Sequence, residues 1–417
     1  MNKYDAYKES GIEWIGDIPS HWQIMPFKRR MTFNNGADYK DWAVDEGYPV
    51  MGSGGQFAFA SKYMFNGEVV LLGRKGTIDR PLYYNGPFWA VDTMLYAVPD
   101  RRAYCKYMYY QALTFPFNYY ATATALPSMT QTDLGNNPVC VPPYYEQKAI
   151  ADYLDTECRK IDDLIAKEEK RVSLLQEVRL SILTKAVLHG LNEGVETAPS
   201  KHSWLGNIPK HWKIMPLRYT ANAKGCCFID GDWIESKDID YDGSIKYLTT
   251  GNVGPGFYKE QGLGYISEEK FKELDCTDVL PGDLLISRLN EPIARTCIVP
   301  DLGSRIVTAV DNVIFRPNPN VLDRKFACYY MNNGRLTEHA NIIARGATMH
   351  RISRTMLGHL PIVLPPLDEQ REIVAFLDKE CGQYDNRIVK ANHQIDLLKE
   401  YKQSLITEVV TGKRKVC

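Results

Sequence analysis

The chain has 417 residues, which is too long for one ordinary domain of about 100 to 200 residues. Apolar residues make up 44% and charged residues 24%, a balance that excludes a disordered or fibrous protein. Basic and acidic residues nearly cancel to a net charge of −1, so any contact with nucleic acid must come from local basic patches. No apolar run approaches the roughly 18 residues of a membrane span, and we expect a cytoplasmic protein.

Two sequence blocks occur twice, in the same order. The opening Trp14–Pro26 recurs as Trp204–Pro216, at an offset of 190 positions. A second block, Pro142–Cys158, recurs as Pro365–Cys381 at an offset of 223, so the stretch between the blocks is 33 residues longer in the second copy. Each copy therefore has similar ends and a divergent middle, and the period is long enough for each copy to be a domain plus a connector.

The divergent middles are predicted to be strand-rich. Glu68–Arg74 and Asp283–Arg288 are short apolar runs that each end at an arginine, and Phe88–Thr93 and Ile306–Asn312 follow them in the same order. Loop signals come earlier in each middle, at Gly52–Gly55 and Thr249–Asn252. The two middles are therefore expected to share one mixed fold and to differ in their loops.

A long helix is predicted after each Pro-Pro pair. Apolar residues recur there at intervals of four and seven, with one interval of three, as in a coiled-coil seam. Prolines precede each helix, and glycines at 190 and 412 mark the ends, which gives roughly 40 residues or ~60 Å. The seam positions are Ile150, Leu154, Ile161, Ile165, Val172, Leu175, Ile182 and Ala186, and Ile373, Leu377, Tyr384, Ile388, Ile395, Leu398, Leu405 and Val409.

Such a stripe must be covered, either by a second copy of the chain or by the other helix of the same chain. Two equal helices in one chain favour intramolecular pairing, and we assign it to Ile150, Leu154, Ile165, Leu175, Ile373, Leu377, Ile388 and Leu398. The predicted domains are 1–143, 144–190 (first helix), 191–366 and 367–417 (second helix and tail).

The sequence contains no recognisable catalytic motif. Gly412-Lys413 is the closest string to a phosphate-binding loop, but Thr407 stands where that loop needs glycine. Amino-methyltransferases place Asn or Asp before Pro-Pro-Tyr/Phe, whereas Val141 and Leu364 stand there and cannot accept a hydrogen bond. The ten cysteines form no C-x-x-C pair and the eight histidines no ligand spacing. We therefore expect no catalytic residues, no metal and no cofactor.

The layout resembles the specificity subunit of type I restriction-modification systems. The resemblance covers nearly the whole chain and rests on Pro-Pro-x-x-Glu-Gln at 142–147 and 365–370, on the two W-[IL]-G-x-I-P-x-H-W openings, and on the terminal Leu405–Gly412. It implies an α+β, pseudo-two-fold protein with two similar target recognition domains, each binding one half of a bipartite asymmetric site in double-stranded DNA. It also implies an antiparallel helix pair that acts as spacer and docks two modification subunits, restriction subunits in the full complex, and no catalytic activity in this chain.

Candidate DNA contacts lie after the matching strands and before the second block. The stretch 340–366 holds Arg345, His350, Arg351 and Arg354 and no acid, while its counterpart 121–143 is rich in Thr and Ser with one acid, Asp133. Asp92 and Asp311 are expected to pair with the arginines that end the strands, and a solvated loop remains the alternative for the basic stretch. The candidates are Arg74, Lys75, Ser128, Gln131, Arg288, Asn290, Arg345, Arg351 and Arg354, with His350 in the same stretch.

Two other classes of function remain possible at this stage. A standalone DNA methyltransferase, or a restriction enzyme with built-in recognition domains, would need a further catalytic domain, and the repeats already occupy the chain. A scaffold protein that binds other proteins through its helices would show no affinity for a DNA duplex. The role of residues 1–13 and the recognised base sequence cannot be derived from the sequence.

Overall fold

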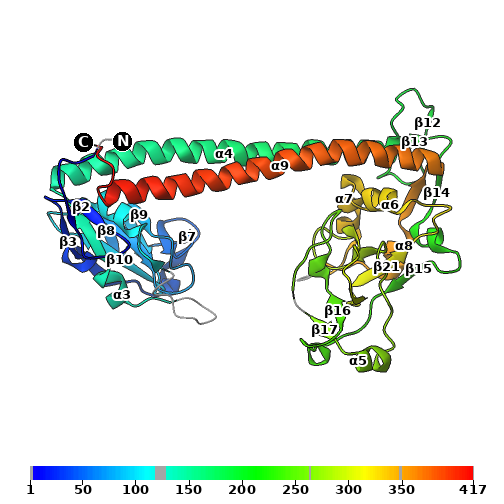
Figure 1. Ribbon diagram of the computed structural model, residues 1–417, viewed down its shortest axis with the longest axis horizontal. Coiled ribbons are helices and arrows are strands. Elements are labelled where there is room, and N and C mark those ends of the chain that lie inside the picture. Colours follow the sequence, from blue (N-terminus) through cyan, green and yellow to red (C-terminus); the bar gives the residue numbers. More distant parts are fainter. Residues whose placement is uncertain (1–2, 118–127, 263, 347–349, 417) are drawn as a thin grey trace. The chain divides into compact units, whose positions relative to one another are not determined.

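The computed structural model describes residues 3–117, 128–262, 264–346 and 350–416 (Figure 1). Its contacts divide the chain into two compact units, each of which takes one divergent middle and about half of each long helix. Unit 1 comprises Met1–Lys170 and Asn392–Cys417, and unit 2 comprises Arg171–Ala391. The predicted domain boundaries followed the ends of the helices, whereas the units divide each helix within its length.

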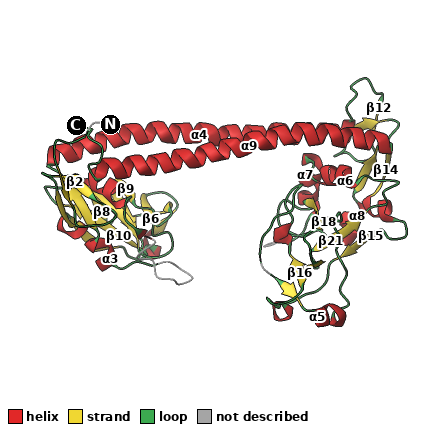
Figure 2. Cartoon of the chain, viewed as in Figure 1, coloured by secondary structure: helices red, strands yellow, loops and turns green. Residues whose placement is uncertain are grey.

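Unit 1 is built on a mixed sheet whose seven strands are ordered β4-β10-β8-β9-β6-β7-β5 (yellow in Figure 2). The apolar residues of β8 and β10 form its centre, and helix α1 packs against it. Its elements are β1 Tyr7–Glu9, β2 Asp17–Pro19, β3 Gln23–Pro26, β4 Met31–Asn35, β5 Ala43–Val44, β6 Tyr48–Gly52, β7 Gly55–Ala60, β8 Phe65–Gly73, β9 Leu82–Ala90, β10 Met94–Pro99, α1 Cys105–Ala112, α3 Gln131–Asn136 and β11 Pro138–Val141.

Unit 2 contains a four-stranded sheet, β15-β21-β18-β19, and a three-stranded sheet, β17-β16-β20. Its elements are β12 Thr197–Pro199, β13 Asn207–Pro209, β14 Lys213–Pro216, β15 Cys227–Asp230, β16 Ile245–Leu248, β17 Tyr265–Ile266, α5 Glu268–Glu273, β18 Leu284–Ser287, β19 Thr296–Ile298, β20 Arg305–Thr308, β21 Asn312–Arg316, α6 Arg324–Met331, α7 Gly334–Ile343, α8 Arg354–His359 and β22 Pro361–Leu364.

The two middles share one mixed fold, as predicted, and the structure shows a common strand order within it. In unit 1, β4, β10, β8 and β9 are neighbours, and the far end of β9 pairs in parallel with β6. In unit 2, β15, β21, β18 and β19 follow the same order, and β20 pairs in parallel with β16. The difference is one interruption: the strand equivalent to β9 is broken between β19 and β20, which divides one sheet into two.

The long helices are α4, Tyr144–His189, and α9, Leu367–Val410. Each starts directly after a Pro-Pro pair and is followed by a glycine with positive φ, 75° at Gly190 and 73° at Gly412, as the sequence predicted. In unit 1 the end of α9 packs on the start of α4 (Figure 1), and Lys402 of α9 pairs with Asp162 of α4 at 2.7 Å. In unit 2 Arg179 of α4 pairs with Asp385 of α9 at 2.7 Å.

These contacts confirm antiparallel pairing of the two helices within one chain, because positions rise along α4 as their partners fall along α9. The seam residues nearest the helix ends are buried in the core of their own unit: Ile150 and Leu154 in unit 1, Ile373 and Leu377 in unit 2. The other four residues assigned to pairing, Ile165, Leu175, Ile388 and Leu398, are half-buried, while the seam positions Ile161 and Ile395 are buried.

Candidate nucleic-acid interface

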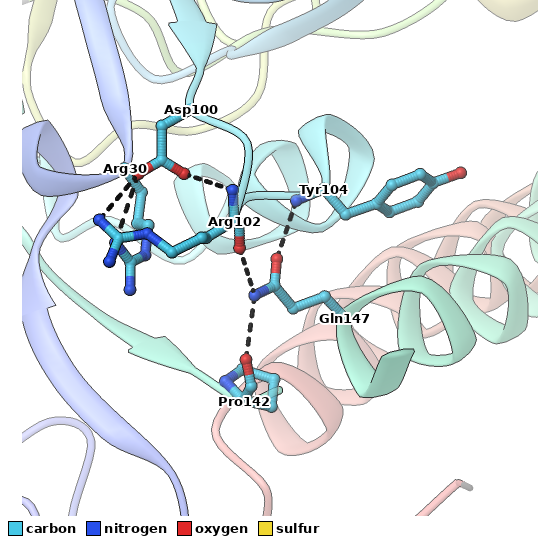
Figure 3. A network of polar contacts seen from close by, with 6 residues as sticks. All are labelled: Arg30, Asp100, Arg102, Tyr104, Pro142 and Gln147. Atoms are coloured by element: carbon cyan, nitrogen blue, oxygen red, sulfur yellow. Dashed lines mark hydrogen bonds and ion pairs between the residues drawn. The ribbon is translucent and has the colours of Figure 1, made fainter. Parts of the chain in front are cut away.

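The glutamine of each repeated Pro-Pro-x-x-Glu-Gln block braces the middle domain against a long helix. The amide oxygen of Gln147 accepts a hydrogen bond from the main-chain N–H of Tyr104 at 2.8 Å, and its Nε2 donates to the carbonyls of Arg102 at 3.1 Å and Pro142 at 3.0 Å (Figure 3). Asp100 ties the same loop to Arg30 at 3.3 Å. A buried amide with both ends satisfied fixes the loop before α1 to the start of α4.

Gln370 makes the same three contacts in unit 2. Its amide oxygen accepts from the N–H of Asp323 at 2.8 Å, and its Nε2 donates to the carbonyls of Val321 at 3.0 Å and Pro365 at 2.9 Å. The repeated glutamine is therefore a structural brace. The sequence could not indicate this role, because two of the three main-chain groups that each glutamine binds lie more than 40 positions away.

The two repeated blocks also meet at the neighbouring glutamate. His21 Nε2 lies 2.8 Å from the buried carboxylate of Glu146, and Trp22 Nε1 donates to the same carboxylate at 3.0 Å. In unit 2, His211 lies 2.8 Å from Glu369 in the same way. The histidine of each opening is thus tied to the start of a long helix, and in unit 1 the tryptophan is as well, whereas Trp212 Nε1 makes no hydrogen bond within the described residues.

An aspartate just over two turns beyond the glutamine of each long helix holds the first helix of the middle domain. Asp155 accepts hydrogen bonds from Lys106 and from Tyr110, the latter at 2.8 Å, and the bond to Asp155 is the main cause that raises the pKa of Lys106. Asp378 receives Lys325 at 2.7 Å and Tyr329 at 2.8 Å. In both units, equivalent side chains therefore hold the middle domain to its long helix in the same way.

The candidate residues of unit 1 come together where β8 ends. The N–H of Arg74 bonds the carbonyl of Thr93 at 2.8 Å, and Lys75 forms an isolated β-bridge with Ser128. Helix α3 begins three residues later at Gln131, whose side chain is exposed. Two segments that lie more than 50 positions apart in the sequence thus form one accessible polar edge.

The candidate residues of unit 2 occupy the same place after β18. Arg288 bonds the carbonyl of Asp311 at 2.8 Å, Leu289 forms a β-bridge with Arg351, and α8 begins at Arg354. The bridge Lys75–Ser128 is therefore equivalent to Leu289–Arg351, and Gln131 is equivalent to Arg354.

The remaining candidates border this edge. Asn290 has a φ of 61° and bonds the carbonyl of His350 at 3.0 Å, and Arg345 and Arg351 bridge each other's main chain. Both Asn290 and Arg345 have exposed side chains. Positions 121–127 and 347–349 of the two predicted stretches lie outside the described residues.

The stretch 340–366 is less basic in the structure than in the sequence, because acids from other segments reach it. Arg351 pairs with Asp311 at 2.8 Å, and Arg354 lies 3.6 Å from Asp230. His350 lies 3.2 Å from Glu291. The three carboxylates, of Asp311, Asp230 and Glu291, lie outside the stretch 340–366 and therefore do not appear in its charge count.

Arg288 is buried, unlike the other candidates. Only 6% of its side chain is exposed, it pairs with Asp230 at 3.2 Å, and it donates to the carbonyl of Val310. Burial lowers the pKa of Arg288, with Arg351 and Arg354 adding to the effect. The expected partner Asp311 is used by Arg351 instead, so Arg288 holds the cluster together and has no free surface for DNA.

In unit 1 the one acid of the counterpart stretch is also engaged. Asp133 accepts the N–H of Thr130 at 3.0 Å, and the Thr130 hydroxyl accepts the N–H of Asp133 at 3.1 Å, which caps α3. Asp92, the proposed partner of Arg74, is exposed. The edge in unit 1 therefore carries Arg74 and Lys75 beside neutral hydroxyl and amide groups.

Within the described ranges, His, Cys, Asp and Glu form no group of three or more that could hold a metal ion. The same ranges include no helix with the length and hydropathy to cross a membrane. The cysteines of the helical and sheet cores are mostly buried, and burial raises the pKa of Cys140 and Cys297 to about 12. At such values these thiols stay protonated and are poor nucleophiles.

Comparison with protein families matches the model of the type I restriction modification DNA specificity domain twice, at residues 22–174 and 209–396. The two matches cover most of the chain and coincide with its two repeats. The chain belongs to this family.

Specificity subunits are also found among its relatives. The putative type I restriction enzyme MjaX specificity subunit of Methanocaldococcus jannaschii is 28% identical over 215 residues, which are 51% of this chain and 48% of the relative. The MjaVIII specificity subunit of the same organism is 22% identical over 70% of this chain and 66% of its own length. The Escherichia coli EcoDI specificity subunit is 20% identical over 95% and 90%. The matched part of the chain thus spans about half of the first relative and about two thirds of the second.

A solved structure shares the fold. It comes from work on complex assembly and conformational transition of the type I R-M system, with a TM-score of 0.64 and 15% identity, over 94% of this chain and 98% of that one. The shared fold therefore covers nearly the whole chain.

Proposed function

We propose that the chain binds double-stranded DNA as the specificity subunit of a type I restriction-modification complex, with each unit contacting one half of a bipartite, asymmetric site. One observation carries the proposal. The same edge, made by the end of one strand and the start of one short helix, occurs in both units with different side chains on it. Equivalent frames that carry unlike polar edges suit two different half-sites.

In this proposal the edges contact DNA through Lys75, Ser128 and Gln131 in unit 1 and through Asn290, Arg345, Arg351 and Arg354 in unit 2. These side chains are exposed or half-buried. Arg74 and Arg288, which end the two strands, hold the edges through their main chains. The near-neutral net charge then matters little, because affinity comes from a few local cations.

The two long helices offer a surface for protein partners. Leu174 and Val178 of α4 are exposed, and so are Leu397 and Tyr401 of α9, at the same offset of 223 positions. Apolar side chains in solvent at equivalent places in each repeat fit two copies of one partner. We propose that these partners are two modification subunits, which supply the catalysis, and that restriction subunits join the complex.

The test of the half-site assignment exchanges one middle domain. Residues 27–141 are replaced by the middle of a related specificity subunit, and the altered chain is produced with its modification subunit. The methylated motif is then determined by sequencing modified genomic DNA. Only one half of the motif should change. A change in both halves, or in neither, would contradict the assignment, and methyl transfer by the purified chain alone would contradict its role as a non-catalytic subunit.

A second experiment tests the proposal that the helices set the distance between the half-sites. Four residues inserted after Glu168 add ~6 Å of helix, which is about two base pairs of 3.4 Å rise. A matched insertion near Arg387 on α9 keeps the two helices equal in length. The methylated motif should gain about two base pairs in its gap. An active complex that keeps its original gap would show that the helices do not determine the spacing.

A further inference from the structure

The polar edge at the end of β8 in unit 1 and the one at the end of β18 in unit 2 differ at residues that contact each other. The N–H of Arg74 bonds Thr93 and the N–H of Arg288 bonds Asp311, each at 2.8 Å, so Thr93 and Asp311 are equivalent. Ser128 and Arg351 are equivalent through their β-bridges. Where unit 2 has the ion pair Asp311–Arg351, unit 1 therefore has a threonine and a serine.

A second pair has changed in the same way. Val313 pairs with Asp230 and with Ile286, two residues before Arg288. Leu95 pairs with Asn35 and with Leu72, two residues before Arg74. Asp230 is therefore equivalent to Asn35.

The neighbours of these two residues agree with this register. The glycines that follow them, Gly231 and Gly36, bond the equivalent carbonyls of Asn312 at 2.8 Å and Met94 at 3.0 Å.

In each of the two pairs, both residues are charged in unit 2 and both are neutral in unit 1. Asp230 and Arg354 are charged in unit 2, whereas Asn35 and Gln131 are neutral amides in unit 1. A half-buried carboxylate without a cation is costly. The loss of Asp311 together with Arg351 in unit 1 therefore fits a pair that changes as one, whereas Asp230 is shared between Arg354 at 3.6 Å and the buried Arg288 at 3.2 Å.

The geometry shows what each aspartate does to its arginine. The carboxylate of Asp311 lies 2.8 Å from Nη2 of Arg351, yet 45% of the arginine side chain is exposed. This contact is an ion pair, and a carboxylate beside one end of the five-donor guanidinium favours one placement of the side chain and leaves donors for a ligand. Arg354 lies 3.6 Å from Asp230 and is 46% exposed.

The cluster also has unused hydrogen-bonding capacity. Four buried atoms of the cluster make no hydrogen bond within the described residues, namely Arg288 Nε, Asn312 Oδ1, Asp230 Oδ1 and Asp311 Oδ1, although both carboxylate atoms lie within ion-pair distance of an arginine. Unsatisfied groups in one corner of a folded domain indicate a place that a bound molecule or water completes.

We propose that Asp311 and Asp230 are positioning residues that hold Arg351 and Arg354 for guanine edges in the major groove, whereas unit 1 contacts its bases through hydroxyl and amide groups. A guanidinium pairs in bidentate fashion with O6 and N7 of guanine, and glutamine pairs with N6 and N7 of adenine. The second half-site should then contain guanine opposite Arg351, and Gln131 should favour adenine in the first. This inference rests on the proposed DNA-binding function.

The experiment uses the full chain in complex with its modification subunit, and a library of duplexes in which both half-sites are randomised. Bound duplexes are sequenced for the wild type and for Asp311→Asn, Asp311→Glu and Arg351→Lys. Asp278→Asn is the matched control, because Asp278 also pairs with an arginine of unit 2, Arg305 at 2.6 Å, away from this edge. Thermal unfolding verifies that each variant is folded.

Asp311→Asn should reduce discrimination at one G·C position of the second half-site about 5- to 150-fold, the range for one bidentate contact. Its affinity for a duplex without the site should stay equal or rise, because one negative charge facing the phosphates is removed. Loss of folding alone would lower both values. Asp311→Glu should restore part of the discrimination, Arg351→Lys should lose it, and Asp278→Asn should change neither value.

Transfer of the pair to unit 1 provides the converse test. Thr93→Asp combined with Ser128→Arg should create a guanine preference at one position of the first half-site. Ser128→Arg alone should raise affinity for any duplex with a smaller gain in preference, because its guanidinium is not held.

The outcomes separate this inference from the proposed function. If the wild type selects no bipartite motif, the DNA-specificity function itself is wrong. If it selects a motif but Asp311→Asn behaves like Asp278→Asn, or if the position that relaxes is not a G·C pair, the function stands and the positioning role of Asp311 is refuted.

Discussion

Replacement of Gln147 by alanine tests the brace between the first middle domain and α4. The substitution removes three hydrogen bonds at 2.8, 3.1 and 3.0 Å, and leaves an N–H and two carbonyls of the main chain without that partner. At a net ~1 kcal/mol for each bond, the free energy of unfolding of unit 1 should fall by about 3 kcal/mol. Gln370→Ala should cost unit 2 about the same, since its three bonds are equivalent.

The assay must report each unit separately, because two units need not unfold as one. Hydrogen exchange measured with increasing denaturant gives the stability of individual segments. In Gln147→Ala the amide of Tyr104 should lose protection, and in Gln370→Ala that of Asp323.

Gln403→Ala is the control, since the single bond from Gln403 to the carbonyl of Leu113 is exposed and should contribute within about 0.5 kcal/mol. If Gln147→Ala costs no more than this control, the repeated glutamine is not a brace, and another reason must be sought for its recurrence.

Three further predictions concern the seam, the edge and a buried acid. Leu154→Ala should destabilise unit 1 by about 2–5 kcal/mol in denaturant unfolding, because Leu154 is fully buried, whereas Leu164→Ala, with 48% of the residue exposed, should have little effect. Lys75→Ala should weaken binding to all duplexes alike and reduce the slope of log affinity against log salt by about 1, while a change in base preference would contradict a phosphate contact. Burial raises the pKa of Asp232 above its ordinary 3.8, so the folded state keeps a proton that the unfolded state releases first. Stability of unit 2 should therefore fall as pH rises through that interval, and Asp232→Asn should flatten the pH profile of unfolding; an unchanged profile would refute the assignment.

The repeats, the two helices and their pairing could be predicted because their signals are local or periodic. Pro142 and Gly190 bound a seam that recurs every three to seven residues, and the second helix repeats it at a constant offset. That the two middles share a mixed fold followed from the matching apolar runs. The interruption that separates β19 from β20 could not be foreseen, since it depends on whether a strand stays paired on both sides.

The sequence named candidate residues after the matching strands and before each short helix, and their contact with DNA stays a prediction. That a β-bridge joins these two segments in each unit could not be derived from the sequence, because the bridging residues lie more than 50 positions apart. The acids were missed because the partner of Arg354 is Asp230, which is 124 positions away in the sequence and on another strand. Arg288 was misjudged as a DNA contact for the same reason: an arginine at a strand end looks accessible until Asp230 and the Val310 carbonyl enclose it.

The distribution of burial explains how one frame can present two different edges. The bracing residues recur with the same type in both repeats, Gln147 with Gln370 and Asp155 with Asp378, and they bond main chain or buried helices, where a change costs stability. Arg351, in contrast, is nearly half exposed, and surface changes usually alter stability by less than about 0.5 kcal/mol. Exchange of the side chains proposed to contact bases is then limited mainly by their partners, because losing only one member of the pair Asp311–Arg351 would leave a charge unpaired. In the proposed function, a few coupled substitutions at the exposed edge could therefore change which half-site a unit binds, while the buried bracing residues stay the same.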